Sequence, residues 1–165
     1  MRDDGPRFDD FPIDPDLTEA ADPGERPTGA AGQRRRWDVV LVVAAGGALG
    51  GGARWTLNQA LPAGADGFPW AAMIENVSGC LLLGALMVFL IEVWAPHRYA
   101  RPFLGVGVLG GFTTFSTYTS DTRVLLLDGS APRGLIYLFG TLILALAATW
   151  TGISLARTAV GIAST

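Results

Sequence analysis

The stretch that decides the fold is GGFTTFSTYTSD, residues 110–121, which lies inside an apolar run from Phe103 to Leu127. A run of this length is enough for an α-helix to cross a hydrocarbon core of about 30 Å. Two adjacent glycines at mid-membrane, Gly110 and Gly111, predict that this helix is broken there and releases backbone carbonyls for an ion. Six Thr and Ser residues within 110–121 alternate with aromatic rings. Such a surface suits lipid poorly and is typical of a narrow polar path.

Three similar apolar segments surround this one. The four expected spans cover about residues 39–61, 68–94, 103–127 and 135–159. The short connectors between them contain Pro or Gly, which break helices. Backbone groups in lipid must be satisfied within the segment, so each span is expected to be a helix. The sequence therefore predicts an all-α membrane protein with four transmembrane helices in one domain, residues 38–160.

The composition excludes several classes of protein. Half of the 165 residues are hydrophobic and 16 % are charged, too few to cover a water-soluble globule. The net charge of −3 and the lack of a basic stripe argue against nucleic-acid binding. A single His and a single Cys leave no His/Cys metal cluster and no disulfide. Because paired catalytic carboxylates, an activated Ser and a nucleotide loop are also missing, we do not expect an enzyme.

A polar segment precedes the first span. Residues 1–37 contain nine acidic residues and many Pro and Gly, and they end in an Arg triplet. Such a segment cannot bury enough apolar surface to fold, so residues 1–37 are predicted to be a disordered acidic tail. The arginines expected on the side of the termini are Arg34, Arg35, Arg36, Arg98, Arg101 and Arg157. The positive-inside rule then places both termini in the cytoplasm of a multi-pass cell-membrane protein.

Polar residues inside the first two spans have two readings each. Arg54 either extends to the membrane–water interface or takes part in the polar path. Asn76 either makes an interhelical hydrogen bond or lines the path. Glu75 is either an interfacial carboxyl or a proton-carrying site.

The polar and glycine motifs together resemble the CrcB/Fluc family of small fluoride channels. The resemblance covers about residues 42–158 and rests on three motifs. They are Gly46-Gly47-Ala48-Leu49-Gly50-Gly51-Gly52-Ala53-Arg54-Trp55, Asn76-Val77-Ser78-Gly79 followed by Gly84, and Gly110-Gly111-Phe112-Thr113-Thr114-Phe115-Ser116-Thr117. The third motif is the most specific of them.

The resemblance implies an antiparallel, dual-topology dimer with two fluoride pores and a structural Na⁺ at its centre. Gly110 and Thr113 would offer backbone carbonyls to Na⁺. The residues implied for the ion pathway are Arg54, Asn76, Phe115, Ser116, Thr117, Tyr118, Tyr137 and Thr141. Of these, Phe115 and Tyr118 would be the aromatic pair that faces fluoride.

The chain departs from the usual family pattern at Ala71-Ala72, Glu75 and Tyr118, which usually are Gly-Thr, a small apolar residue and Phe. The function expected from the resemblance is that of a fluoride-specific channel subunit, which lowers cytoplasmic fluoride by passive efflux. Its expected partner is a second CrcB-type subunit, in a hetero- or homodimer. One alternative is a small multidrug-type, proton-coupled antiporter that uses Glu75. Another is a non-conducting structural partner in a heterodimeric channel.

Overall fold

The computed structural model describes residues 30–61, 67–93 and 98–161, with side chains from Trp37 onward. All regular elements in these ranges are helical. They are α2 (Ala30–Ala60), α3 (Trp70–Val88), η2 (Phe89–Val93), η3 (Arg101–Leu109), α4 (Gly110–Phe112), α5 (Phe115–Leu127) and α6 (Ala131–Ala159). Of the predicted tail, residues 1–29 lie outside the described residues. The first helix already begins at Ala30, before the border predicted at residue 37.

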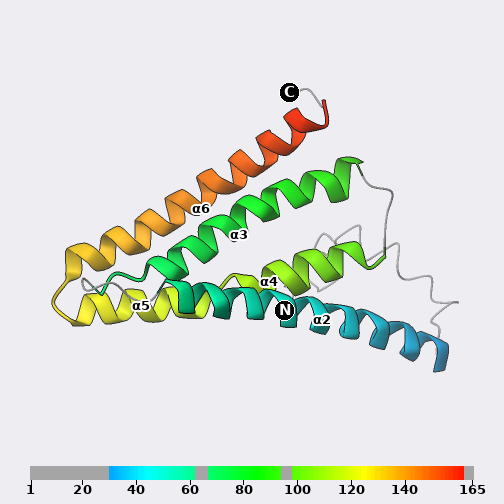
Figure 1. The fold of residues 1–165 in the computed structure, drawn as a ribbon, viewed down its shortest axis with the longest axis horizontal. Helices are drawn as coiled ribbons and strands as arrows, with labels where there is room; N and C mark the ends of the chain where they lie inside the picture. The colour runs from blue at the N-terminus through cyan, green and yellow to red at the C-terminus, as the bar shows by residue number, and fades with distance from the viewer. Residues whose placement is uncertain (1–29, 62–66, 94–97, 162–165) are drawn as a thin grey trace, which may run out of the picture. The chain divides into compact units, whose positions relative to one another are not determined.

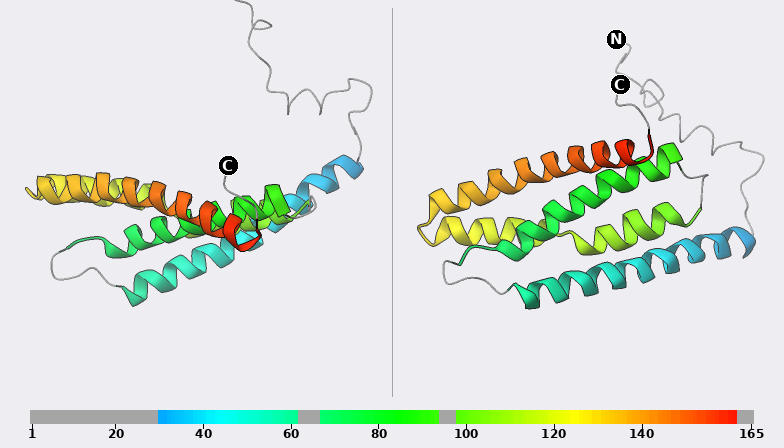
Figure 2. Two further views of the ribbon diagram at one scale, coloured as in Figure 1. Left: turned by 90° about the horizontal axis from the view of Figure 1, so that it is seen from above. Right: turned by 45° about the horizontal axis from the view of Figure 1, so that its top comes forward.

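Three helices of the described chain are long and apolar enough to cross a membrane without interruption. They cover Trp37–Ala60, Trp70–Val93 and Ala131–Ala159. The predicted third span is also helical, but it consists of separate pieces, η3 with α4 and then α5. Successive spans run in opposite directions, with α2 and α6 at opposite edges and the other spans between them (Figures 1 and 2). The four predicted spans therefore correspond to three continuous helices and one interrupted segment.

Helices α3 and α6 pack backbone against backbone. A Cβ atom at Gly84 would overlap the carbonyl of Thr149, and one at Gly152 would overlap the carbonyl of Leu81. Small residues of this kind let helices approach closely. In lipid such close packing drives helix association, because no hydrophobic effect brings the helices together there. The glycines of α3 and α6 therefore allow this close helix pair.

Glycines also join α2 to the first half of the third span. A Cβ at Gly46 would meet the carbonyl of Phe103, and one at Gly50 would overlap the carbonyl of Val108. From the other side, a Cβ at Gly111 would meet the carbonyl of Gly47. The close contact predicted for the glycine-rich first helix is thus present, and it is made with η3 and α4.

The interruption of the third span lies C-terminal to the predicted one. Gly110 and Gly111 are helical, and the chain leaves the helix at Thr113 (φ −77°, ψ 157°) and Thr114 (φ −145°, ψ 114°). The prediction of a break at Gly110-Gly111 is therefore corrected by three residues. The physical reason is that Gly111 lets α2 pack closely against the third span. The backbone opens at Thr113 and Thr114 instead, where Asn76 of α3 hydrogen-bonds to Thr114.

Two ion pairs tie the helices together at one end of the body. Arg98 Nη2 lies 3.1 Å from Asp38 Oδ2, and Arg157 Nη2 lies 2.6 Å from Glu92 Oε1. Asp38 belongs to the first part of α2 and Glu92 to the last part of the second span. Arg98 and Arg157 therefore lie at the same end, as the sequence predicts.

Candidate functional site

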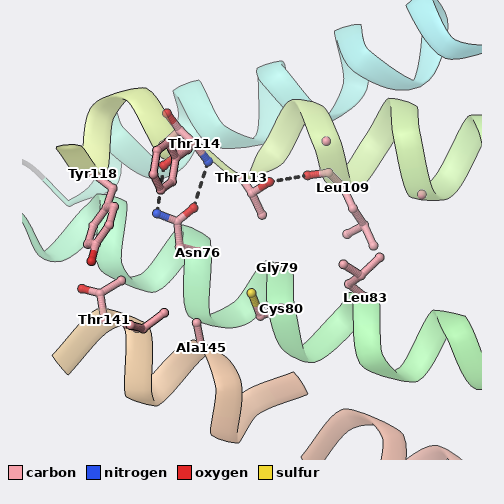
Figure 3. A pocket seen from close by; sticks show the side chains of 14 residues that line it. Asn76, Gly79, Cys80, Leu83, Leu109, Thr113, Thr114, Tyr118, Thr141 and Ala145 are labelled. Atoms are coloured by element: carbon pink, nitrogen blue, oxygen red, sulfur yellow. Dashed lines mark hydrogen bonds between the residues drawn. The ribbon is translucent and has the colours of Figure 1, made fainter. Parts of the chain in front are cut away.

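The interruption of the third span is held by the side-chain amide of Asn76 on α3. Asn76 Nδ2 donates to the Thr114 carbonyl at 3.0 Å, and the Thr114 N–H donates to Asn76 Oδ1 at 2.9 Å (Figure 3). The amide thus satisfies both backbone groups of a residue that has left the helix. Gly79, one turn further along α3, leaves room for the Thr113 methyl group, which a Cβ at position 79 would overlap. Asn76 and Gly79 therefore explain why the backbone opens at Thr113 and Thr114.

Thr114 also starts the following helix. Its hydroxyl accepts from the Thr117 N–H at 3.2 Å and donates to the Thr117 hydroxyl at 2.9 Å. The Ser116 hydroxyl lies 3.4 Å from the Thr114 hydroxyl. Such a side-chain cap satisfies one of the free N–H groups in the first turn of a helix. Within this subunit, Ser116 and Thr117 belong to the cap of α5.

The same contacts release two backbone carbonyls. The Thr114 N–H, which in a continuous helix would bond to the carbonyl of Gly110, instead donates to Asn76. The Thr117 N–H, which would bond to the carbonyl of Thr113, instead donates to the Thr114 hydroxyl. Gly110 and Thr113 are the two residues predicted to offer carbonyls to a cation. Free carbonyls of interrupted membrane helices are typical ligands for such ions.

A cavity of about 340 Å³ lies beside the interruption. Six of the predicted site residues line it: Asn76, Gly110, Thr113, Phe115, Tyr118 and Thr141. Thr114 and Cys80 also line it, and most of the remaining wall is apolar. Irregular backbone at membrane depth is tolerated where it lines such a cavity. The cavity therefore brings residues of α3, the third span and α6 together at one site (Figure 3).

Aromatic rings continue from the cavity into the protein. The ring centroids of Phe115 and Tyr118 lie 5.9 Å apart, and those of Tyr118 and Tyr137 lie 5.5 Å apart. The Tyr118 hydroxyl donates to the Leu138 carbonyl at 2.6 Å, which leaves the ring, and not the hydroxyl, available to the cavity. Phe115 is 77 % exposed, so in a single subunit one face of the pair is open.

Two hydroxyl groups on one face of α6 are buried and unpaired. Tyr137 and Thr141 are one turn apart, and they are 0 % and 3 % exposed. Among the residues that the structure describes, three buried side-chain atoms have no hydrogen-bond partner: Glu75 Oε2, the Tyr137 hydroxyl and the Thr141 hydroxyl. Buried polar groups are nearly always satisfied, by protein, water or ligand. The unpaired hydroxyls of Tyr137 and Thr141 therefore indicate a place where another species can bind.

The remaining predicted residue, Arg54, does not line the cavity. It is half-buried on α2, one turn before Asn58. Asn58 Nδ2 donates to Glu75 Oε1 at 2.5 Å, and Arg54 is close enough to Glu75 for an electrostatic interaction. The structure thus places Arg54 in a second polar group, with Asn58 and Glu75.

Two residues of these sites were not among the predicted site residues. The Thr114 backbone is the group that Asn76 binds, and the TTFST block contained a signal for it, since a hydroxyl directly before a helix is a typical cap. Asn58 is the partner of Glu75. It lies near the end of the first apolar run, and no spacing in the sequence connects it to Glu75.

Comparison with known proteins gives a consistent picture. The family model "CrcB-like protein, Camphor Resistance (CrcB)" matches residues 41–153. "Fluoride-specific ion channel FluC 1" of Streptomyces coelicolor is 48 % identical over 127 residues, which are 77 % of this chain and 82 % of that protein. "Fluoride-specific ion channel FluC 2" of Nocardia farcinica is 45 % identical over 76 % of this chain and 89 % of its own length. "Fluoride-specific ion channel FluC" of Nitrobacter winogradskyi is 37 % identical over 74 % of this chain and 98 % of its own. The matched region contains every residue of the cavity, and this chain belongs to the CrcB family.

Proposed function

We propose that this chain is a subunit of a fluoride channel, which lets fluoride leave the cell passively through the membrane. The observation that carries the proposal is the cavity beside the interrupted third span, in a chain whose relatives are named fluoride-specific ion channels. Passive conduction needs no bound reactant and no chemical step, so the protein is not an enzyme.

The residues around the cavity suit a small, strongly hydrated anion. A pore must replace the water around such an ion with other hydrogen-bond donors. Asn76 uses one amide N–H on Thr114 and retains a second one, and the Thr141 hydroxyl is unpaired. The ring edges of Phe115 and Tyr118 carry partial positive charge and can face an anion. Fluoride would pass these groups and then Tyr137.

Ser116 and Thr117 are assigned to another part of the proposed fluoride path. Both side chains are exposed on the first turn of α5, beside the open face of Phe115. We place them on the part of the path that a second subunit completes.

A structural Na⁺ fits the carbonyls of Gly110 and Thr113. The fit rests on the two hydrogen bonds that the interruption diverts, because they leave both oxygens without their regular helical donors. Na⁺ would supply positive charge that holds the two carbonyls together. Gly110 is exposed, so the ion would lie on the surface that a partner covers.

We further propose an antiparallel dimer of two CrcB-type subunits in the cell membrane, with both termini of this chain in the cytoplasm. Exposed residues on the third span support a partner there, since Val106, Gly110 and Phe115 share its open side. The partner is either a second copy or a homologous subunit.

The two alternative functions can be tested against this one. A proton-coupled multidrug antiporter would need Glu75 in contact with a bulky lipophilic cation, but Glu75 is fully buried and is not among the cavity residues, so there is no room for such a cation beside it. The test is a fluoride-electrode recording from liposomes that contain the purified chain, with chloride and a lipophilic cation as controls. Rapid fluoride efflux without proton-coupled cation uptake supports the proposal. If efflux appears only after a homologous subunit is added, the chain is a partner in a heterodimeric channel.

A further inference from the structure

Glu75 is a buried carboxyl group inside the membrane-spanning body. The residue is 0 % exposed. Its Oε1 accepts from Asn58 Nδ2, whereas its Oε2 has no hydrogen-bond partner among the residues that the structure describes. No ion pair of Glu75 within 4.0 Å occurs in the described part of the chain. A carboxylate in such a place is costly unless something compensates its charge.

The groups that face Glu75 come from three other helices. Arg54 and Asn58 lie on α2, Asp121 lies on α5 and Tyr137 lies on α6. Asp121 is within electrostatic range of both Glu75 and Tyr137. We call these five residues the Glu75 cluster. It contains two carboxyl groups and one guanidinium, so one negative charge remains if both carboxyl groups are ionised.

The Glu75 cluster follows the cavity along a chain of contacts. Tyr118 lines the cavity, and its ring packs against the ring of Tyr137. Tyr137 in turn is within electrostatic range of Glu75, and each has a buried oxygen without a partner among the described residues. An anion that leaves the cavity past the two tyrosines would therefore come within electrostatic range of the Glu75 carboxyl group. An ionised carboxylate there would repel it.

We propose that Glu75 works in its neutral form, with the proton on Oε2, and donates a hydrogen bond to fluoride at this end of the path. The proton stays on Glu75 while fluoride passes. A neutral carboxyl keeps Oε1 as acceptor for Asn58, turns Oε2 into a donor, and removes the surplus negative charge beside Asp121. The inference rests on the proposed channel function and adds a selectivity residue to it.

The first experiment measures fluoride efflux from liposomes between about pH 5.5 and about pH 8.5, with protein-free liposomes at each pH to subtract permeation of HF. Above the titration point of the carboxyl, the neutral population falls about tenfold for each pH unit, and we expect efflux to fall with it. Glu75→Gln keeps an uncharged donor at every pH, so the pH dependence should disappear. Glu75→Ala removes the donor and should transport more slowly than Glu75→Gln at each pH.

The second experiment does not depend on transport. Infrared spectra of the purified protein should show the carbonyl stretch of a protonated carboxylic acid at neutral pH, and the band should be lost in Glu75→Gln but kept in Asp121→Asn. Absence of this band, or its loss only in Asp121→Asn, would overturn the inference even if fluoride transport is normal. Efflux that is independent of pH in the parent overturns it as well, unless the band persists over the whole pH range and so shows that Glu75 stays protonated throughout. If the band is present and the parent chain transports no fluoride at any pH, with or without a partner subunit, the channel function fails and the protonation of Glu75 stands.

Discussion

The side-chain amide of Asn76 binds the backbone of Thr114 in both directions, with Nδ2 on the carbonyl at 3.0 Å and Oδ1 on the N–H at 2.9 Å. A residue that leaves a helix inside a membrane exposes two polar backbone groups, each of which costs free energy if it is unsatisfied. One amide side chain supplies both missing partners. Asn76 is thus the group that makes the interruption of the third span stable.

Replacement of Asn76 by Asp tests this role. An ionised Asp still accepts from the Thr114 N–H but cannot donate to the Thr114 carbonyl. A buried acceptor without a partner costs about 1–3 kcal/mol, so we expect a lower melting temperature in detergent together with slower fluoride efflux. Ser78→Ala is the matched control, because the Ser78 hydroxyl donates to the Ile74 and Glu75 carbonyls, both in its own helix. Equal stability of the two variants would contradict the role of Asn76.

The sequence predicted the helices well because their signals are local. Apolar length alone locates the spans near Trp70–Val93 and Ala131–Ala159, and the glycines indicate close contacts between helices. The position of the interruption was missed by three residues, because it depends on a side chain of α3 that lies far away in the sequence. The same limit applies to Glu75, whose partner Asn58 comes from the end of another helix. Contacts between helices decide both features, and a single sequence does not show them.

The glycines of α2 differ in what surrounds them, which predicts different effects of Ala. A methyl group at Gly50 would overlap the Val108 carbonyl and press on the Phe112 N–H, whereas a methyl group at Gly51 meets nothing within 4 Å. Overpacking of this kind costs about 1–3 kcal/mol. We expect Gly50→Ala to lower the melting temperature and Gly51→Ala to leave the isolated subunit unchanged. A similar loss of stability in both variants would show that α2 does not pack on the third span as described.

The aromatic pair predicts opposite outcomes for two substitutions. Phe115→Ile keeps an apolar side chain but removes the ring edge, and a contact worth about 0.5–1.5 kcal/mol corresponds to a fall in efflux of about two- to twelvefold. Tyr118→Phe keeps the ring and loses only the hydrogen bond to the Leu138 carbonyl. It should transport at least as fast as the parent, with stability lowered by about 1 kcal/mol. Fluoride efflux and thermal unfolding of both variants test these expectations. Unchanged efflux in Phe115→Ile would argue against a role of the aromatic pair in facing fluoride.

A substitution at Gly110 can distinguish a Na⁺ site from ordinary helix packing. Among the described residues, a methyl group at Gly110 would meet only the Gly105 carbonyl at 3.8 Å, and one at Gly105 would meet nothing within 4 Å. Within one subunit both positions therefore accept Ala. We expect Gly110→Ala to weaken the dimer more than Gly105→Ala, because Gly110 lies at the carbonyls offered to Na⁺. Dimer dissociation on dilution, measured with Na⁺ and with a large organic cation, tests this, and equal behaviour of the two variants would leave Gly110 as a plain surface glycine.

The last prediction concerns the pairing of subunits, and it rests on the distribution of arginines. Arg34, Arg35 and Arg36 precede the first span, and Arg98 and Arg157 lie at the same end of the body as Asp38. At the other end, Arg133 lies in the first turn of α6 and Arg123 lies in the last part of α5. The ion pairs of Arg98 and Arg157 do not remove this bias, since acidic residues contribute little to the positive-inside rule.

This bias should fix one orientation of the chain, with both termini in the cytoplasm. An antiparallel dimer then needs a homologous subunit inserted the other way, so we expect the protein to work as half of a heterodimer. Reporter fusions at the C-terminus test the orientation, and a variant with Arg34, Arg35 and Arg36 replaced by Gln serves as control, because it should insert in both directions. A reporter found equally on both membrane faces of the parent, together with fluoride efflux by the chain alone, would instead establish a homodimer.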